Sequence, residues 1–402
     1  MEERIKWVNN QNARKKGIKA GVDSFSENEL RKVRSFHKSF PQYEVTPLRN
    51  LSNLAGMTGV SGIYVKDESY RFGLNSFKVL GASYAIGRYL AQLLNLDIDG
   101  LSFERFKTEE IREKLGEITF AATSDGNHGR GVAWAAQQLG QKAVIYMPKG
   151  SSLIRLGNIT ATGAEGHITE LNYDDTVRLT AVNAQKYGWA IIQDTAWEGY
   201  EDIPLWIMQG YAVIGHEALE QLNQQGVDAP THIFIQAGVG SLAGGIQGYF
   251  ASTFKDSRPI TVVVEPNKAD CFYKSVLAGN GRPRSVTGDM DTIMVGLACG
   301  EPNPMGWRIL WDYADVFISC PDHIAANGMR ILGNPLREDP RIVSGESGAV
   351  TTGILVEILR NEHMKEIREQ LLLDKDSKIL VWSTEGDTDP VNYRKIVWDG
   401  DI

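Results

Sequence analysis

Short runs of apolar residues alternate with segments of helical periodicity along most of this chain. Ile118–Thr123 and Lys142–Met147 have the length and the apolar content of buried strands. The alanine-rich segment between them, Arg130–Leu139, predicts a helix. This alternation is typical of open parallel sheets covered by helices, so we expect an α/β fold. The other segments expected to form strands are Ile63–Glu68, Trp189–Ile192, His232–Gln236, Thr261–Val264, Val316–Ser319 and Lys378–Trp382.

Two parts of the chain depart from this alternation. Residues 1–45 mix charges with scattered aromatic side chains, and Phe103–Glu117 is rich in charge. We expect the first to form surface helices and loops packed on the body of the protein, and the second to form one exposed helix.

One lysine lies where a helical period begins. Lys78 directly precedes apolar residues spaced at mostly three- and four-residue steps, so we expect it at a helix N-terminus, partly removed from water. Burial and the positive end of a helix both lower the pKa of an amine, which favours a nucleophile that can form a Schiff base. The alternative is a lysine that only extends into solvent. The residues expected on the buried face are Val79, Ala82, Ile86, Leu90, Leu93 and Leu94.

A glycine-containing turn follows the predicted strand His232–Gln236. In Ala237-Gly238-Val239-Gly240-Ser241, glycines let backbone amides approach an anion, and a following helix adds its positive end. The turn is therefore a candidate phosphate site. GxG also begins a dinucleotide fingerprint, but the acidic residue needed about 20 positions later does not lie at a strand end here. Tight packing of a helix on a strand is the structural alternative.

Two further strand ends offer polar groups at the same edge of a parallel sheet. The turn Ser124-Asp125-Gly126-Asn127 can present amides to a substrate carboxylate, and Asn127 can bond a ring hydroxyl. After Lys378–Trp382, the hydroxyl of Ser383 or Thr384 can bond a pyridine nitrogen. A lysine, a phosphate site, an amide turn and a strand-end hydroxyl together indicate pyridoxal 5'-phosphate.

Composition argues against several other classes of protein. A formal net charge of −8 disfavours nucleic acid as a partner. No apolar run approaches the roughly 18 residues of a membrane span. The charged start Met1–Lys6 lacks a signal-peptide core, so we expect a cytoplasmic protein that contacts no membrane. Cys271, Cys299 and Cys320 form no CxxC pair, which favours reduced thiols over a metal site; a Cys271–Cys299 bond is the alternative.

Several short motifs occur in a set order along residues 46–390. They are Thr46-Pro47-Leu48, Lys66-Asp67-Glu68, Ser76–Ala82, Gly126–Gly129, Met147-Pro148, Gly163-Ala164-Glu165, Val264-Glu265-Pro266 and Glu346–Ala349. In this order the chain resembles the fold-type-II, or tryptophan-synthase-β-like, pyridoxal phosphate enzymes. The resemblance implies that Lys78 holds the cofactor, with Phe77 beside it.

Departures from the general pattern narrow the resemblance. Threonine and serine dehydratases commonly carry alanine where this chain has Asp125, and a run of glycines where it has Ala237–Ser241. With Asn172–Leu179 and Gln193–Tyr200, these departures resemble the diaminopropionate ammonia-lyases. That family implies elimination from 2,3-diaminopropionate to pyruvate and ammonia, and a homodimer.

Two aspartates are the expected bases. The family links aspartates at the matching positions to proton abstraction from the two substrate enantiomers, which implies Asp125 for the D-isomer and Asp194 for the L-isomer. Carboxylates also suit a cationic substrate tail. The alternatives are a turn residue that caps a helix for Asp125, and a surface carboxylate or cap for Asp194.

Two other functions stay open at this point. One is a serine or threonine dehydratase, or another lyase of β-substituted alanines, with the same fold. The other is a non-catalytic homologue that binds pyridoxal phosphate. For all three we expect two domains with the cofactor in the cleft: residues 1–85 and 216–402 as a large discontinuous domain, and residues 86–215 as a small inserted one.

Overall fold

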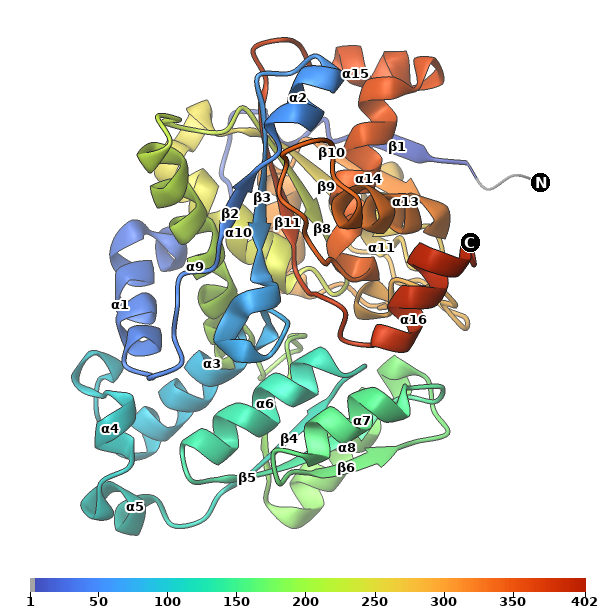
Figure 1. Ribbon diagram of the computed structural model, residues 1–402. Helices are drawn as coiled ribbons and strands as arrows, with labels where there is room; N and C mark the ends of the chain where they lie inside the picture. The colour runs from blue at the N-terminus through green and yellow to red at the C-terminus, as the bar shows by residue number, and fades with distance from the viewer. Residues whose placement is uncertain (1–3) are drawn as a thin grey trace.

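Two separate β-sheets organise the molecule (Figure 1). The computed structural model describes residues 4–402, so Met1–Glu3, at the charged start of the chain, lies outside them. The larger sheet consists, in spatial order, of β1 (Lys6–Asn9), β10 (Val316–Cys320), β9 (Ile260–Pro266), β8 (His232–Gln236), β11 (Lys378–Ser383), β3 (Gly62–Asp67) and β2 (Leu48–Asn50). The smaller consists of β6 (Glu165–Ile168), β5 (Lys142–Met147), β4 (Thr119–Thr123) and β7 (Ala190–Ile191).

Helices cover both faces of the larger sheet (Figure 1). Along β8, Ile233 and Ile235 pack in one apolar cluster and Phe234 in the other, as the two-residue period of a strand requires. One face carries α2 (Ser52–Thr58), α13 (Asp322–Gly333), α14 (Glu346–Arg360) and α15 (Lys365–Gln370). The other carries α1 (Glu27–Lys38), α9 (Asp202–Gln224), α10 (Ser241–Phe254) and α12 (Pro304–Tyr313). Helix α11 (Cys271–Ala278) lies near the β10 edge, and α16 (Pro390–Arg394) lies near the C-terminus.

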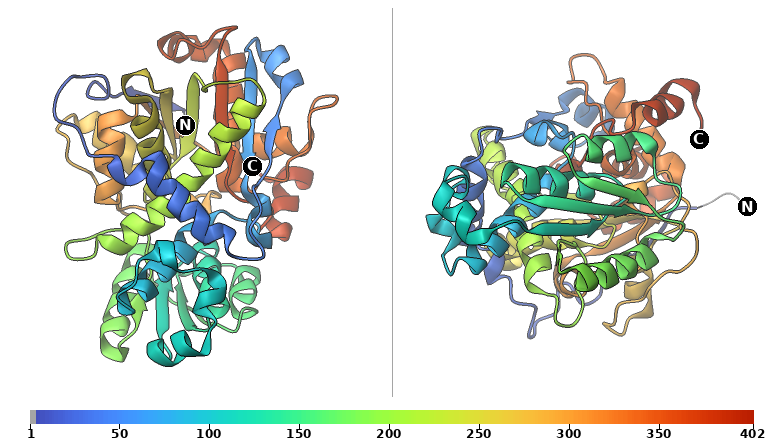
Figure 2. Two further views of the ribbon diagram at one scale, coloured as in Figure 1. Left: turned by 90° about the vertical axis from the view of Figure 1, so that its left-hand side faces the viewer. Right: turned by 90° about the horizontal axis from the view of Figure 1, so that it is seen from below.

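The smaller sheet also has helices on both faces (Figure 2). All its strands run parallel. Its helices are α6 (Asn127–Gln138), α7 (Leu153–Thr160) and α8 (Tyr173–Tyr187). In the sequence, α3 (Lys78–Leu93), α4 (Phe103–Phe106) and α5 (Glu109–Leu115) come between β3 of the larger sheet and β4 of the smaller one. The domain limits at residues 86 and 215 fall inside α3 and α9, so those limits stay a prediction.

The predicted α/β class is confirmed, and the inner strands of both sheets are parallel. The edge strands β1 and β2 pair antiparallel, which the pattern did not indicate. The buried side chains of Phe25, Phe36 and Phe40 agree with the expectation that residues 1–45 pack on the body of the protein.

Three further differences concern local structure. The segment from Phe103 forms two short helices rather than one, with Phe103 and Phe106 buried. Helix α6 begins at Asn127 and not at Arg130, so the preceding turn leads directly into it. Leu93 is exposed because α3 ends there.

Within residues 4–402, none of the helices has both the length and the apolar character needed to cross a bilayer.

Candidate active site

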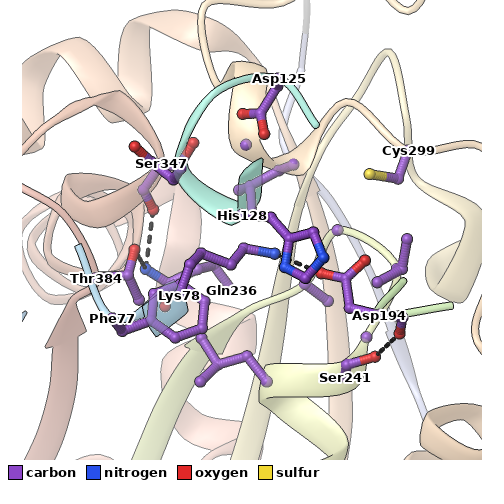
Figure 3. Close-up of a pocket in the computed structure, with 18 of the residues that line it drawn as sticks. Phe77, Lys78, Asp125, His128, Asp194, Gln236, Ser241, Cys299, Ser347 and Thr384 are labelled. Carbon is purple, nitrogen blue, oxygen red and sulfur yellow. Dashed lines mark hydrogen bonds and ion pairs between the residues drawn. The ribbon is translucent and has the colours of Figure 1, made fainter. Parts of the chain in front are cut away.

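A cavity lies where the carboxyl ends of strands from both sheets meet (Figure 3). The turns after β4, β7, β8 and β11 and the start of α3 form its walls, as expected for parallel α/β sheets. It encloses about 700 Å³ not filled by protein, open solvent included. The residues that line it are Phe77, Lys78, Asp125, Asn127, His128, Tyr173, Asp194, Gln236–Ala243, Val295–Leu297, Cys299, Ser347, Thr384 and Glu385.

The turn after β8 has the geometry of an anion site. Gly240 has a φ of +90°, and a Cβ there would lie 2.3 Å from Cζ of Phe272. A Cβ at Gly238 would lie 3.0 Å from the carbonyl oxygen of Gly296. A side chain at position 240 would overlap the Phe272 ring, and one at position 238 would crowd the Gly296 backbone, so both glycines allow the close packing of the turn. The amides of residues 238–241 have no acceptor within the described part of the chain, and α10 begins at Ser241.

The Ser241 side chain holds a second turn. Its hydroxyl donates to the carbonyl oxygen of Asp194, and Asn303 Nδ2 donates to both groups, at 2.8 Å to Ser241 Oγ and 3.1 Å to the Asp194 oxygen. The turn after β8 and the turn that carries Asp194 are thereby held together.

Lys78 and Asp194 form an ion pair inside the cavity. Lys78 Nζ lies 2.6 Å from Asp194 Oδ2. Burial alone lowers the pKa of Lys78, but the negative charge of Asp194 outweighs it, so the pKa lies above its usual range. Burial raises the pKa of Asp194 and Lys78 outweighs that effect, so this pKa is lowered. The expectation of a lowered lysine pKa was wrong in this structure, because Asp194 lies beside the amine.

Asp125 lies across the cavity from Asp194 (Figure 3). Its Oδ2 atom is buried, has no hydrogen-bond donor within residues 4–402 and lies 3.6 Å from Nη1 of Arg155. Asn127, two residues after Asp125, donates from Nδ2 to Glu385 Oε2. Ser124 and Gly126 are not among the lining residues, because the Ser124 hydroxyl accepts from Gly126 N and serves the turn itself.

The two strand-end hydroxyls are not equivalent. Thr384 lines the cavity and its Oγ1 accepts from Gln236 Nε2 at 3.2 Å. The Ser383 hydroxyl is fully buried and donates to Ser344 Oγ at 2.8 Å. Thr384 is therefore the hydroxyl available to a ligand.

His128 is held in a structural hydrogen bond. Its Nε2 donates to the carbonyl oxygen of Ile192 at 2.7 Å, and burial lowers the pKa of the ring. The ring thus stays neutral and joins the turns after β4 and β7.

These groups fit pyridoxal phosphate. The phosphate turn offers free amides, Lys78 offers its amine, and Thr384 offers a hydroxyl. Several buried polar atoms around the cavity have no hydrogen-bond partner within residues 4–402: Asp125 Oδ2, Asp194 Oδ1, Gln236 Oε1 and Ser347 Oγ. Buried polar atoms are normally hydrogen-bonded, so such a group indicates a polar ligand.

Sequence reasoning missed part of the wall. Tyr173 and Ser347 lie within motifs that carry the family resemblance, so a signal for both was present. The loop Val295–Leu297 and the buried Arg155 had no such signal. Cys271, Cys299 and Cys320 are free and buried, and Cys299 lines the cavity.

Comparison with known proteins agrees with this geometry. The family described as pyridoxal-phosphate dependent enzyme matches residues 40–380. The diaminopropionate ammonia-lyase of Salmonella typhimurium is 52% identical over 100% of this chain and 99% of its own length, and that of Escherichia coli K12 is 55% identical over 94% and 93%. The crystal structure of the Escherichia coli enzyme in complex with D-serine has a TM-score of 0.92, at 50% identity, and covers 99% of this chain and 98% of that one. The chain therefore belongs to the pyridoxal-phosphate-dependent enzymes and, within them, to the diaminopropionate ammonia-lyases.

Proposed function

We propose that Lys78, Asp125 and Asp194 are the catalytic residues of this ammonia-lyase. The enzyme uses pyridoxal phosphate and converts 2,3-diaminopropionate and one water to pyruvate and two molecules of ammonia. The bound cofactor supplies an electron sink for the charge left when the substrate loses its α-proton. The side chains of this chain must therefore bind the cofactor, move protons and exclude water.

Four groups hold the cofactor in this proposal. The Lys78 amine attaches it, the amides of Gly238–Ser241 bind its phosphate, and Thr384 bonds the ring nitrogen. Asn127 bonds the ring hydroxyl. Support comes from the amides of the turn, which have no acceptor within residues 4–402, and from the place of Thr384 on the cavity wall.

Asp194 has two tasks. The Lys78 amine must lose its proton before it can attach the cofactor, and Asp194 Oδ2 is 2.6 Å from Nζ, within reach of a direct transfer. Once freed of that ion pair, the same carboxylate can remove the α-proton of the L-enantiomer. Asp125, on the opposite side of the cavity, would do so for the D-enantiomer.

The carboxylates also suit the leaving group. Asp125, Asp194 and Glu385 all line the cavity, and burial raises the pKa of Glu385 to about 7. A cavity lined by three carboxyl groups favours a substrate that carries an ammonium group at the β-carbon. Protonated, that group leaves as neutral ammonia.

The observation that carries the proposal is the pair of carboxylates that line the cavity with Lys78, Asp194 beside the amine and Asp125 across the cavity (Figure 3). The test is pyruvate release from D- and L-diaminopropionate by wild type, Asp125→Asn and Asp194→Asn. We expect Asp125→Asn to lower kcat for the D-isomer by about 100-fold or more and to spare the L-isomer. Asp194→Asn should lower kcat for the L-isomer by a similar factor and for the D-isomer by much less, because the Lys78 amine also loses the carboxylate that takes its proton.

Asp202→Asn, at the exposed start of α9, is the control and should leave both rates unchanged. D- and L-serine serve as competing substrates. If neither aspartate change separates the enantiomers, or if serine is the better substrate, the assignment of the two bases fails.

We also propose a cytoplasmic homodimer of 44.5 kDa subunits. Support for the dimer comes from the family resemblance, and support for the compartment comes from the three free thiols, which suit a reducing environment. Sedimentation equilibrium of the holoenzyme would contradict the dimer if it returned a single subunit mass.

A further inference from the structure

A buried arginine lies beside one of the two aspartates. Arg155, on α7, is 7% exposed, and its Nη1 is 3.6 Å from Asp125 Oδ2. Removing a guanidinium from water is costly unless opposite charges or hydrogen bonds compensate. Its burial beside Asp125 therefore indicates a task that depends on its charge.

The stem of Arg155 packs on the turn that carries Asp125. A Cβ at Gly126 would lie 2.8 Å from Arg155 Cδ and 3.1 Å from its Cβ, and Gly126 has a φ of +145°. The methylene groups of the arginine thus cover the backbone of the turn, and glycine leaves the room for them. Arg155 constrains this turn by packing as well as by charge.

Four carboxylates face the Arg155 guanidinium from three segments. They are Asp125 in the turn after β4, Glu346 at the start of α14, and Glu385 and Asp389 after β11. Burial lowers the pKa of Arg155, and these charges, Glu385 foremost, raise it above its usual value, so the side chain is a cation.

Asp125 depends on this cation more than the other three do. Glu385 accepts from Asn127 Nδ2 and from Ser347 N, and Glu346 accepts from Asn392 Nδ2. Asp389 accepts from the Ser152 hydroxyl at 2.8 Å. By contrast, Asp125 Oδ2 has no hydrogen-bond donor within residues 4–402, and Arg155 is its ion-pair partner.

Asp194 is independent of Arg155. It lies in the turn after β7, and its partners are Lys78 for the carboxylate and Ser241 and Asn303 for the backbone carbonyl. A change at Arg155 therefore acts on one of the two bases.

We propose that Arg155 is the positioning residue for Asp125 and so sets turnover of the D-enantiomer without contributing to that of the L-enantiomer. This inference rests on the proposed function, in which Asp125 is the base for the D-isomer. Arg155 acts through Asp125: its charge keeps the carboxylate directed into the cavity, and its stem holds the turn.

The test measures kcat and KM for both enantiomers in the holoenzymes of Arg155→Met and Arg155→Lys. We expect Arg155→Met to lower kcat for D-diaminopropionate by about 10- to 100-fold, as for a displaced catalytic group, with L-turnover within about threefold of wild type. Arg155→Lys keeps a charge near Asp125 and should restore most of the D-activity. Arg155→Gln replaces Arg155→Met if the latter does not fold.

A double variant separates this inference from the proposed function. If Arg155 acts through Asp125, then Asp125→Asn with Arg155→Met loses no more D-activity than Asp125→Asn alone. Arg258→Met is the matched control, because Arg258 is an equally buried arginine that donates to Tyr313 O and Ala13 O, remote from the cavity lining.

Equal loss for the two enantiomers in Arg155→Met, while Asp125→Asn still separates them, would overturn the positioning role and leave the proposed function intact. If Asp125→Asn itself fails to separate the enantiomers, the proposed function falls and this inference falls with it.

Discussion

At the scale of single residues, the phosphate turn depends on one glycine. Gly240 adopts a left-handed backbone conformation, and its hydrogen faces the ring of Phe272, a fully buried side chain. Any other residue must strain the backbone and displace that ring at the same time. The turn therefore adopts this conformation because residue 240 has no Cβ.

Replacing Gly240 by alanine should weaken both the fold and cofactor binding. We expect Gly240→Ala to lower the free energy of unfolding by about 2–4 kcal/mol, because strain and overpacking add. The apoenzyme should bind pyridoxal phosphate at least about tenfold more weakly, since each 1.4 kcal/mol of lost interaction is tenfold in affinity. Urea denaturation and a spectroscopic cofactor titration measure the two effects.

Gly226→Ala is the matched control for that change. Gly226 also has a positive φ, of +76°, but a Cβ there meets nothing within 4 Å. We expect a loss of about 1–2 kcal/mol from the backbone alone and unchanged cofactor affinity. Equal effects of the two substitutions on affinity would contradict the steric argument.

At the scale of elements, a buried ionic network joins β3 to α9. Lys66 Nζ is 2.9 Å from Glu217 Oε2, and Arg71 is 2.7 Å from the same atom and 2.8 Å from Glu68 Oε2. All four side chains are fully buried. Lys66 and Glu68 thus both take part in ion pairs, and the network secures the segment Glu68–Gly73 that leads to Lys78.

Removing one charge from this network should be costly. Burial alone would raise the pKa of Glu217, but Arg71 and Lys66 hold it well below its usual range. Glu217→Gln leaves two cations opposite Glu68 alone, so we expect a loss of about 3–5 kcal/mol at pH 7. Chemical denaturation measures it, with Glu113→Gln on the exposed face of α5 as the control.

The same network predicts a pH dependence. The pKa of Glu217 is lower in the folded than in the unfolded protein, so its stabilisation is fully present above about pH 4.5 and is lost as the pH falls through the folded value. The difference in free energy of unfolding between wild type and Glu217→Gln should therefore shrink as the pH is lowered from 5 to about 3. A difference that stays constant with pH would contradict this assignment.

At the scale of the whole molecule, the cofactor cavity joins the two sheets. Asn127 of α6 donates to Glu385 after β11, and the Ser152 hydroxyl before α7 donates to Asp389 before α16. Lys78 and Asp194 form a further bridge at the cavity. A ligand that binds there contacts both sheets and stabilises their arrangement.

Removal of the cofactor should therefore lower the melting temperature. A ligand that binds only the folded state adds about 2.7 kcal/mol at a concentration of 100 times its Kd. Scanning calorimetry of apoenzyme titrated with pyridoxal phosphate measures this effect. Pyridoxal without phosphate is the control and should stabilise less, because it cannot use the amides of Gly238–Ser241. Equal stabilisation by both compounds would show that the phosphate turn contributes nothing.

The sequence by itself determined the inner strands, the turns and the family. β5 and β8 begin and end at the predicted residues, and α10 begins directly after the glycine-containing turn that follows β8. These features depend on the periodicity of apolar residues and on the local properties of glycine, so the information lies within each segment. The motif order identified the enzyme family for the same reason.

The tertiary structure alone decided which distant groups meet. The edge strands β1 and β2 exist because β10 and β3 offer them partners, and neither short segment has a strong pattern of its own. Lys78 has a raised pKa because Asp194, 116 positions later, lies beside it. Thr384 lines the cavity and Ser383 does not. Arg155 reaches Asp125 in the same way. Electrostatic and steric effects depend on distance in space, which residue order does not specify.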